Sequence, residues 1–296
     1  MKRLEQRPAI NYSGYRENQH PRYKTYPSKE EILEDLKLLE GEFYHLRIYD
    51  CSPHAYRVLE LIDEHELDFK VMLGLSLAAE INHVDHPYFW VYPEERLAEN
   101  VMDNEERIQE IIDLANRYEH IVSAVSIGNE IRSPWSNRRL AVDRMVEITK
   151  QIQADIKAPV TYCEEYQIWI ADLAPLAAAV DFISLHTYPA WQGSPIEEAL
   201  DVAVRNYQEV RDAYPDKPAI ITETGWPTSS HGNKIKTEWA NETNQKIYNA
   251  QISAWGKDND VLVYLFEAFD EPWKGGNHPD EPEKHWGIYN VDRTRK

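Results

Sequence analysis

Cysteine is scarce in this chain of 296 residues, where only Cys51 and Cys163 occur. They lie far apart and in no metal-binding or redox spacing, so we predict free thiols rather than a disulfide framework. Long hydrophobic runs are also missing, which argues against a membrane span and a membrane partner. Residues 1–8 contain no hydrophobic segment of the signal-peptide type. The location stays open: cytoplasmic as the chain stands, secreted or periplasmic if a signal was removed.

Basic residues are outnumbered, with 32 Lys and Arg against 51 Asp and Glu, which gives a formal net charge of −19. An acidic surface repels polyanions, so we predict no nucleic-acid partner. The binding of a neutral substrate would not depend on this net charge. The chain has nine Trp and eighteen Tyr, whose flat faces suit sugar rings, although aromatic residues are equally ordinary core material.

Short apolar runs alternate with amphipathic stretches along the whole chain. The predicted strands are 8–12, 43–49, 69–75, 121–127, 159–163, 181–186, 219–223 and 261–267. The predicted helices are 28–40, 53–65, 94–118, 136–154, 167–180, 194–214 and 238–255. This alternation predicts an α/β fold, a (β/α)8 barrel that forms a single domain over residues 1–296. Because residues 268–296 read as loop, we expect the eighth outer helix to be reduced or absent.

A doubly wound open sheet is the main rival architecture. No Gly-rich phosphate turn follows the first predicted strand, which disfavours this rival.

Polar side chains stand where several predicted strands end. Glu130 follows the fourth strand and Glu223 ends the seventh, just before the chain breaks at Gly225-Trp226-Pro227. The carboxyl ends of barrel strands converge on one face, so these two acids can flank one bond. Glycosidic cleavage needs two such carboxylates, one to protonate the leaving oxygen and one to attack the sugar or activate water. Taken alone, Glu223 is more simply a structural residue that caps a neighbouring element or pairs with an arginine, and only the combined pattern favours catalysis.

Three stretches carry a family resemblance. Residues 126–130 (SIGNE), 222–228 (TETGWPT) and 269–274 (FDEPWK) resemble glycoside hydrolase family 17, the β-1,3-glucanase family. That family belongs to a clan of barrel glycosidases with acids on strands four and seven. The Gly-Asn-Glu motif is shared across the clan, whereas Glu-Thr-Gly-Trp-Pro is much more specific. The long loop after residues 69–75 and the polar stretch 13–27 are more similar to bacterial members than to plant enzymes.

The resemblance implies a role for several of these residues. Glu130 would be the general acid/base and Glu223 the nucleophile of a retaining double displacement. Asn129 resembles the residue that hydrogen-bonds the sugar 2-hydroxyl, and its simpler reading is a turn residue. Glu271 and Lys274 match a supporting pair after the eighth strand, which could also be a weak salt bridge at the rim.

Further side chains near the strand ends are candidates for substrate binding. Tyr49 and His186 are expected to line the floor of the pocket, and the stacking candidates are Tyr188, Trp191, Trp226, Trp273 and Trp286. Any of these aromatic residues could instead pack beneath the loops. The spacing of His83, Asp85 and His86 resembles a metal site, but they lie in a polar loop without further ligands. We therefore predict no metal and no cofactor.

The sequence thus favours a retaining, endo-acting hydrolase of β-1,3-glucan of the laminarin type, expected to work as a monomer. One alternative is a β-1,3-glucanosyltransferase that passes the same covalent intermediate to a sugar instead of water. Another is a glucan-binding barrel without activity, which is disfavoured because both acids are present.

Overall fold

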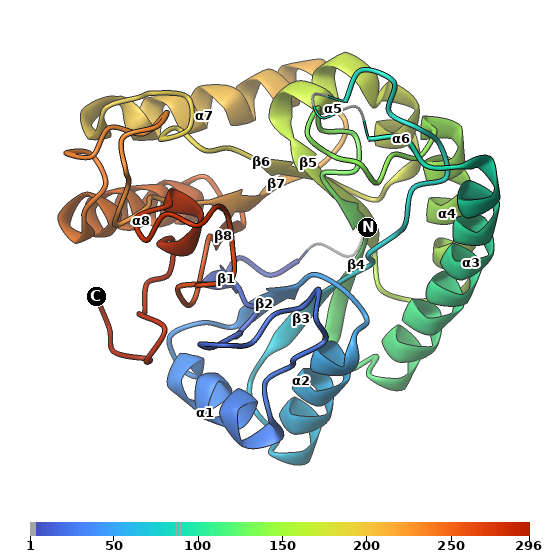
Figure 1. The fold of residues 1–296 in the computed structure, drawn as a ribbon, viewed down its shortest axis with the longest axis horizontal. Helices are drawn as coiled ribbons and strands as arrows, with labels where there is room; N and C mark the ends of the chain where they lie inside the picture. Colours follow the sequence, from blue (N-terminus) through green and yellow to red (C-terminus); the bar gives the residue numbers. More distant parts are fainter. Residues whose placement is uncertain (1–3, 87, 89) are drawn as a thin grey trace.

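Eight parallel strands form a closed barrel in the computed structural model, which describes residues 4–86, 88 and 90–296 (Figure 1). Each strand pairs with the next along the chain, and β8 pairs with β1. The strands are β1 (Ala9–Asn11), β2 (His45–Ile48), β3 (Lys70–Gly74), β4 (Val122–Asn129), β5 (Val160–Glu165), β6 (Ile183–His186), β7 (Ala219–Thr224) and β8 (Val263–Leu265). The predicted (β/α)8 fold is confirmed.

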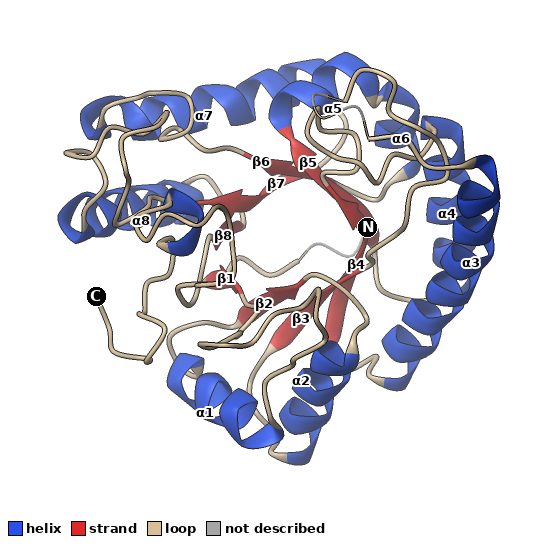
Figure 2. Cartoon of the chain, viewed as in Figure 1, coloured by secondary structure: helices blue, strands red, loops and turns tan. Residues whose placement is uncertain are grey.

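Helices surround the barrel and cover its outer face (Figure 2). They are α1 (Lys29–Leu39), α2 (Pro53–Glu64), α3 (Glu94–Arg117), α4 (Val142–Asp155), α5 (Tyr166–Asp172), α6 (Ala174–Ala179), α7 (Ile196–Ala213) and α8 (Glu242–Asp258). The only helical element in the described chain after β8 is a 3-10 turn, Pro282–Lys284. The outer helix that would follow the last strand is therefore reduced, as predicted. None of the described helices has the length and apolar character that crossing a bilayer requires.

Local sequence explains where several helices begin and end. Ser28 and Glu31 form a reciprocal capping box at the start of α1, as the sequence predicted. The single helix predicted over 167–180 is two helices, because Pro175 stands in the first turn of α6 and the chain breaks at Leu173. The helix predicted from Ser194 begins instead at Ile196, since a residue that precedes a proline is kept out of the helical region.

The largest departure from the predicted elements follows β4. Residues 136–141 are loop, and α4 begins only at Val142, so the helix predicted from 136 is six residues too long at its start. The loop is held by side chains of β5: the backbone N–H of Ile131 donates to the Tyr162 hydroxyl at 2.8 Å and that of Arg132 to Glu164 Oε2 at 3.0 Å. These tertiary bonds fix a non-helical path for the chain that leaves β4.

The strand ends that carry the polar residues are also irregular. The pairing register shifts in β4–β5 between Ser126 and Asn129, in β6–β7 between Leu185 and His186, and in β7–β8 between Ile221 and Thr224. Such irregularities bend a strand and change the direction of the side chains beside it. These shifts lie at the mouth of the barrel where the polar strand-end residues stand.

Candidate active site

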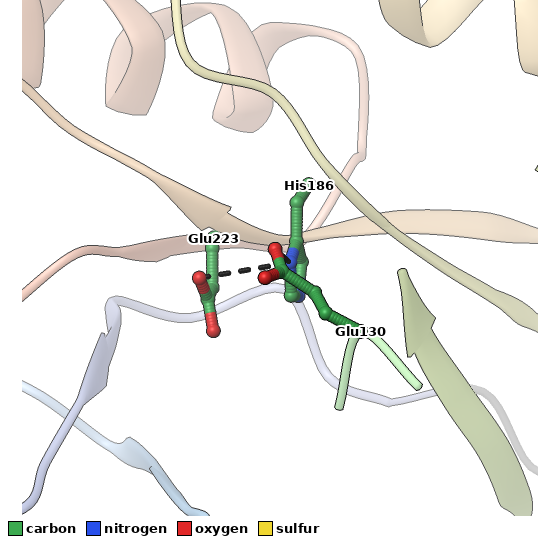
Figure 3. Close-up of side chains that lie close together, drawn as sticks. All are labelled: Glu130, His186 and Glu223. Atoms are coloured by element: carbon green, nitrogen blue, oxygen red, sulfur yellow. Dashed lines mark hydrogen bonds and ion pairs between the residues drawn. The ribbon is translucent and has the colours of Figure 1, made fainter. Parts of the chain in front are cut away.

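Two carboxylates from opposite sides of the barrel share one cavity. Glu130 follows β4 and Glu223 lies on β7, and both line a cavity of about 1030 Å³ at the carboxyl ends of the strands. The side chain of His186 lies between them and contacts both carboxylates (Figure 3). One ligand atom from each of the three residues lies within 4.8 Å of the others. The two acids predicted from the sequence are therefore brought together.

Glu130 is held in an uncommon backbone conformation. Its φ is 49°, in the left-handed region that residues with a side chain seldom adopt. The Glu130 N–H donates to the Cys163 carbonyl at 2.9 Å, which ties this turn to β5. Its Oε1 accepts from His186 Nδ1 at 2.8 Å and its Oε2 from Trp135 Nε1 at 3.3 Å. The side chain keeps 21% of its surface exposed, so solvent and substrate can reach it.

Glu223 is almost fully buried, with a side-chain exposure of 6%. Its Oε1 accepts from Arg47 Nη1 at 2.5 Å and from the Tyr49 hydroxyl at 3.1 Å, and its Oε2 accepts from the Tyr188 hydroxyl at 2.6 Å. Burial by itself would raise the pKa of Glu223, but the charges of His186 and Arg47 outweigh it and bring the pKa to about 2. The carboxylate is thus ionised over any ordinary working range.

His186 lies between the two acids and is protonated there. Burial would lower its pKa, but Glu223, Cys163 and Glu130 raise it to about 10. Its Nδ1 lies 3.6 Å from Glu223 Oε2 as well as 2.8 Å from Glu130. Among the described residues, Glu130, His186 and Glu223 are the group whose ligand atoms lie close enough together to hold a metal ion. A histidine that binds a metal must be neutral, whereas His186 donates the proton of Nδ1 to Glu130 Oε1 in this arrangement.

Arg47 is a functional residue that the sequence prediction missed. It lies inside the barrel on β2, with 2% of its side chain exposed. Besides Glu223 it donates to Asn129 Oδ1 at 2.5 Å and to Asn11 Oδ1 at 2.9 Å. One buried cation therefore orients both the predicted nucleophile and the predicted sugar-binding amide. The available signal was an arginine within the apolar strand 43–49, whose neighbours at the barrel mouth include carboxylates. The sequence alone does not distinguish such an arginine from one at the rim of the barrel.

A second charged cluster lies after β8. Lys274 contacts Glu271 and lies 3.2 Å from Glu267, and both carboxylates are buried. The pair Glu271–Lys274 expected from the resemblance is therefore present, with Glu267 as a third member. Burial, then the charge of Glu271, raises the pKa of Glu267 well above its usual value. Trp273 Nε1 donates to Glu271 Oε1 at 3.1 Å, which fixes this indole at the cavity wall.

The aromatic candidates fall into two groups. Tyr49, Tyr188, Trp191, Trp273 and Trp286 line the cavity, as does His186. Tyr188 and Trp191 surround Trp286 at centroid distances of 5.2 and 6.1 Å, so these three form one aromatic wall.

Trp226 does not line the cavity, which corrects its prediction as a substrate contact. It is fully buried, donates its Nε1 to the Trp239 carbonyl at 2.8 Å and packs on Tyr248. This indole therefore packs against α8, which carries Tyr248.

The cavity wall is rich in acids that the sequence prediction did not name. Burial, then the charges of Glu130 and Glu164, raises the pKa of Glu165 to about 7. Burial also raises the pKa of Glu283 to about 7, against the opposing charge of Lys274. The lining carboxylates are Asp50, Glu130, Glu165, Glu223, Glu271, Glu281 and Glu283, against the cations Arg22, Arg138, His186, Lys234 and Lys274.

His83 and His86 lie outside this cavity. His83 Nδ1 donates to the Ser136 carbonyl at 3.1 Å and His86 Nε2 to the Trp135 carbonyl at 3.2 Å. Both rings serve to join the loop after β3 to the loop after β4.

Comparison with known proteins places this geometry in a family. The sequence model of the BtgE/BtgC glycoside hydrolase domain matches residues 9–287. A glucan 1,3-beta-glucosidase of Arthroderma benhamiae is 29% identical over 194 residues, 60% of this chain and 61% of that protein. A probable glucan endo-1,3-beta-glucosidase btgC of Aspergillus clavatus is 25% identical and covers 98% of this chain. The chain spans 42% of the length of that relative.

Solved structures share the fold. An endo-laminarinase from Formosa superposes with a TM-score of 0.81 at 24% identity, over 96% of this chain and 83% of that one. A family 17 beta-1,3-glucanosyltransferase from Rhizomucor miehei gives 0.75 at 21% identity, over 97% and 94%. The match over residues 9–287 confirms the family resemblance seen in the sequence: the chain belongs to the BtgE/BtgC glycoside hydrolase family.

Proposed function

We propose that the chain is a retaining, endo-acting hydrolase of β-1,3-glucan of the laminarin type. The observation that carries this proposal is that one carboxylate oxygen of Glu130 lies within 4.8 Å of one carboxylate oxygen of Glu223, in one cavity. Retaining glycosidases hold their carboxyl groups about 5–5.5 Å apart, whereas inverting enzymes need about 6.5–9.5 Å to admit a water. The fungal relatives are named as glucan 1,3-beta-glucosidases, which supports the β-1,3-glucan linkage.

In the first half of the reaction Glu223 attacks the anomeric carbon. Its pKa of about 2 keeps it ionised, and it forms the covalent bond as the glycosidic bond breaks. Glu130 donates its proton to the leaving oxygen. Asn129 accepts from Arg47 through Oδ1, so its Nδ2 group remains as a donor for the sugar 2-hydroxyl.

In the second half Glu130 takes a proton from the attacking water, and the bond to Glu223 breaks. The buried charges of His186 and Arg47 are already in place to receive the carboxylate when it is released, so the site does not have to reorganise. Tyr49 and Tyr188 donate to the same two oxygens.

The test is incubation with β-1,3-, β-1,4- and mixed-linkage glucans, followed by analysis of product lengths over time. We expect laminarin to be cut to short oligosaccharides by the wild type and not by Glu223→Gln. Cleavage of β-1,4-glucan with no cut in laminarin would contradict the proposed linkage. Products longer than a starting oligosaccharide would instead favour the glucanosyltransferase.

A further inference from the structure

A half-exposed indole stands beside Glu130. Trp135 lies in the loop between β4 and α4, lines the cavity, and keeps 51% of its surface exposed. Its Nε1 donates to Glu130 Oε2 at 3.3 Å. Indole rings bury most of their surface in folded proteins. An indole left open at a cavity wall is therefore poised to cover an apolar ring face of a ligand.

The loop that carries Trp135 is fixed from below. Ser133 Oγ donates to Glu164 Oε1 at 2.5 Å, and the Arg132 N–H donates to Glu164 Oε2 at 3.0 Å. The Tyr162 hydroxyl donates to the same Glu164 Oε2 at 2.6 Å. Ser133, Tyr162 and Glu164 are all buried. The base of the loop is thus a satisfied polar network on β5, which leaves the backbone little freedom.

The same loop is also held from the side by the segment after β3. His86 donates to the Trp135 carbonyl at 3.2 Å and His83 to the Ser136 carbonyl at 3.1 Å. The Ile81 N–H donates to the Arg139 carbonyl at 3.2 Å. The backbone on both sides of Trp135 is therefore ordered before any ligand arrives. A surface fixed in advance binds with less loss of conformational entropy.

The position of Trp135 decides which sugar it meets. The sugar that becomes bonded to the enzyme lies over Glu223, and the leaving oxygen lies beside Glu130. Trp135 contacts Glu130, so it lies on the leaving-group side. Arg138, three residues further along the same loop, also lines the cavity and donates to Ser76 Oγ at 3.0 Å. Its other guanidinium N–H groups offer donors for sugar hydroxyls beside a flat apolar face, the combination that a pyranose ring requires.

We propose that Trp135 is the stacking platform for the glucosyl unit on the leaving-group side, and that it holds a sugar acceptor there after the first half-reaction. This inference rests on the proposed function. In the transfer step the acceptor hydroxyl oxygen bonds to the anomeric carbon, the bond to Glu223 breaks, and the hydroxyl proton passes to Glu130. Trp135 thereby sets how the glycosyl-enzyme divides between sugar and water.

The experiment compares two substrates that differ only in their leaving group. Laminaripentaose places glucosyl units on Trp135, whereas β-laminaribiosyl fluoride releases an ion too small to reach it. For Trp135→Ala we expect kcat/KM on the pentaose to fall about tenfold or more, equivalent to ~1.4 kcal/mol of stacking, and kcat/KM on the fluoride to fall less than about threefold. Trp135→Phe keeps a ring face and loses the N–H donor, so it should recover most of the pentaose activity.

A matched control is Trp90→Ala. Trp90 is 52% exposed, lies in the loop before α3 with its ring 6.0 Å from Tyr92, and is not among the residues that line the cavity. We expect this variant to keep wild-type values on both substrates. With laminaribiose added to the fluoride reaction, the yield of laminaritetraose should drop in Trp135→Ala relative to Trp90→Ala.

Each contrary outcome has a distinct meaning. A Trp135→Phe variant as poor as Trp135→Ala on the pentaose would overturn the platform and assign Trp135 to positioning Glu130 through its N–H. An equal loss of kcat/KM on both substrates would also overturn the platform, because the fluoride reaction needs neither a sugar on the leaving-group side nor a proton from Glu130. Failure of the wild type to turn over either substrate would overturn the proposed function itself.

Discussion

Removal of the buried cation beneath Glu223 is the most direct test of how the site keeps its nucleophile ionised. Arg47 lies 2.5 Å from Glu223 Oε1 and is a principal cause of the pKa of about 2. An opposite charge at such a distance shifts a carboxyl pKa by about 1–3 units. In Arg47→Met we therefore expect the pKa of Glu223 to rise into the range of ~3–5, since burial and His186 remain.

The assay is the pH profile of kcat/KM on β-laminaribiosyl fluoride, because fluoride leaves without a proton from Glu130. A depressed pKa keeps the carboxylate charged until the pH falls through it, so the wild-type profile should stay flat down to about pH 4. At that pH a variant whose Glu223 pKa is ~4 retains about half its plateau rate, and one with a pKa of ~5 about a tenth.

Arg47→Lys is the matched control, because it keeps the charge and loses the forked donor group. Loss of one partner of a buried ion pair costs about 3–5 kcal/mol of stability, so circular dichroism must show that the Met variant is folded at each pH. Identical acid limbs in the wild type and in the folded Met variant would refute the assigned role of Arg47.

Three further predictions concern the pair of acids and the histidine between them. The first-formed product of laminarioligosaccharide cleavage should carry the β configuration at its new reducing end, as seen by ¹H NMR within the first minutes; initial α product would contradict the 4.8 Å spacing as a retaining geometry. Glu223→Gln should lose turnover and still bind laminarihexaose, as measured by calorimetry. Glu130→Ala should recover activity when azide is added, on a substrate whose leaving group needs no proton. If the folded Glu130→Ala variant is not rescued, Glu130 is not the acid/base. Native His186 keeps its proton up to pH about 10, from an ordinary value of 6.5, so the unfolding free energy should fall as pH rises between these values, and His186→Gln should flatten that slope in urea titrations.

The barrel could be predicted from sequence because its signals are local and repeated. Eight apolar runs separated by amphipathic stretches leave few topologies open. The two acids could be predicted because each stands at a strand end within a short motif. Their separation could not, since it depends on where the register shifts in β4–β5 and β6–β7 aim the side chains.

Other features depend on contacts between distant parts of the chain. Arg47 contacts a carboxylate 176 residues away, and nothing in the sequence around β2 predicts that pairing. The start of α4 was misplaced because Tyr162 and Glu164 on β5 take up the backbone donors of the preceding loop. That same loop presents Trp135, a cavity residue that the sequence prediction did not name. Trp226 was misassigned because proximity to a motif does not give the direction of a side chain.

The ring of carboxylates around the cavity gives the cleft a charge preference. A polysaccharide without ionised groups would enter with a rate that hardly changes between dilute and concentrated salt. A carboxymethylated or sulfated glucan would approach like charge at the mouth and be turned away most strongly at low ionic strength, where the Debye length is long. The acidic residues that line the cavity would thus favour uncharged glucans over anionic glucans of the same linkage.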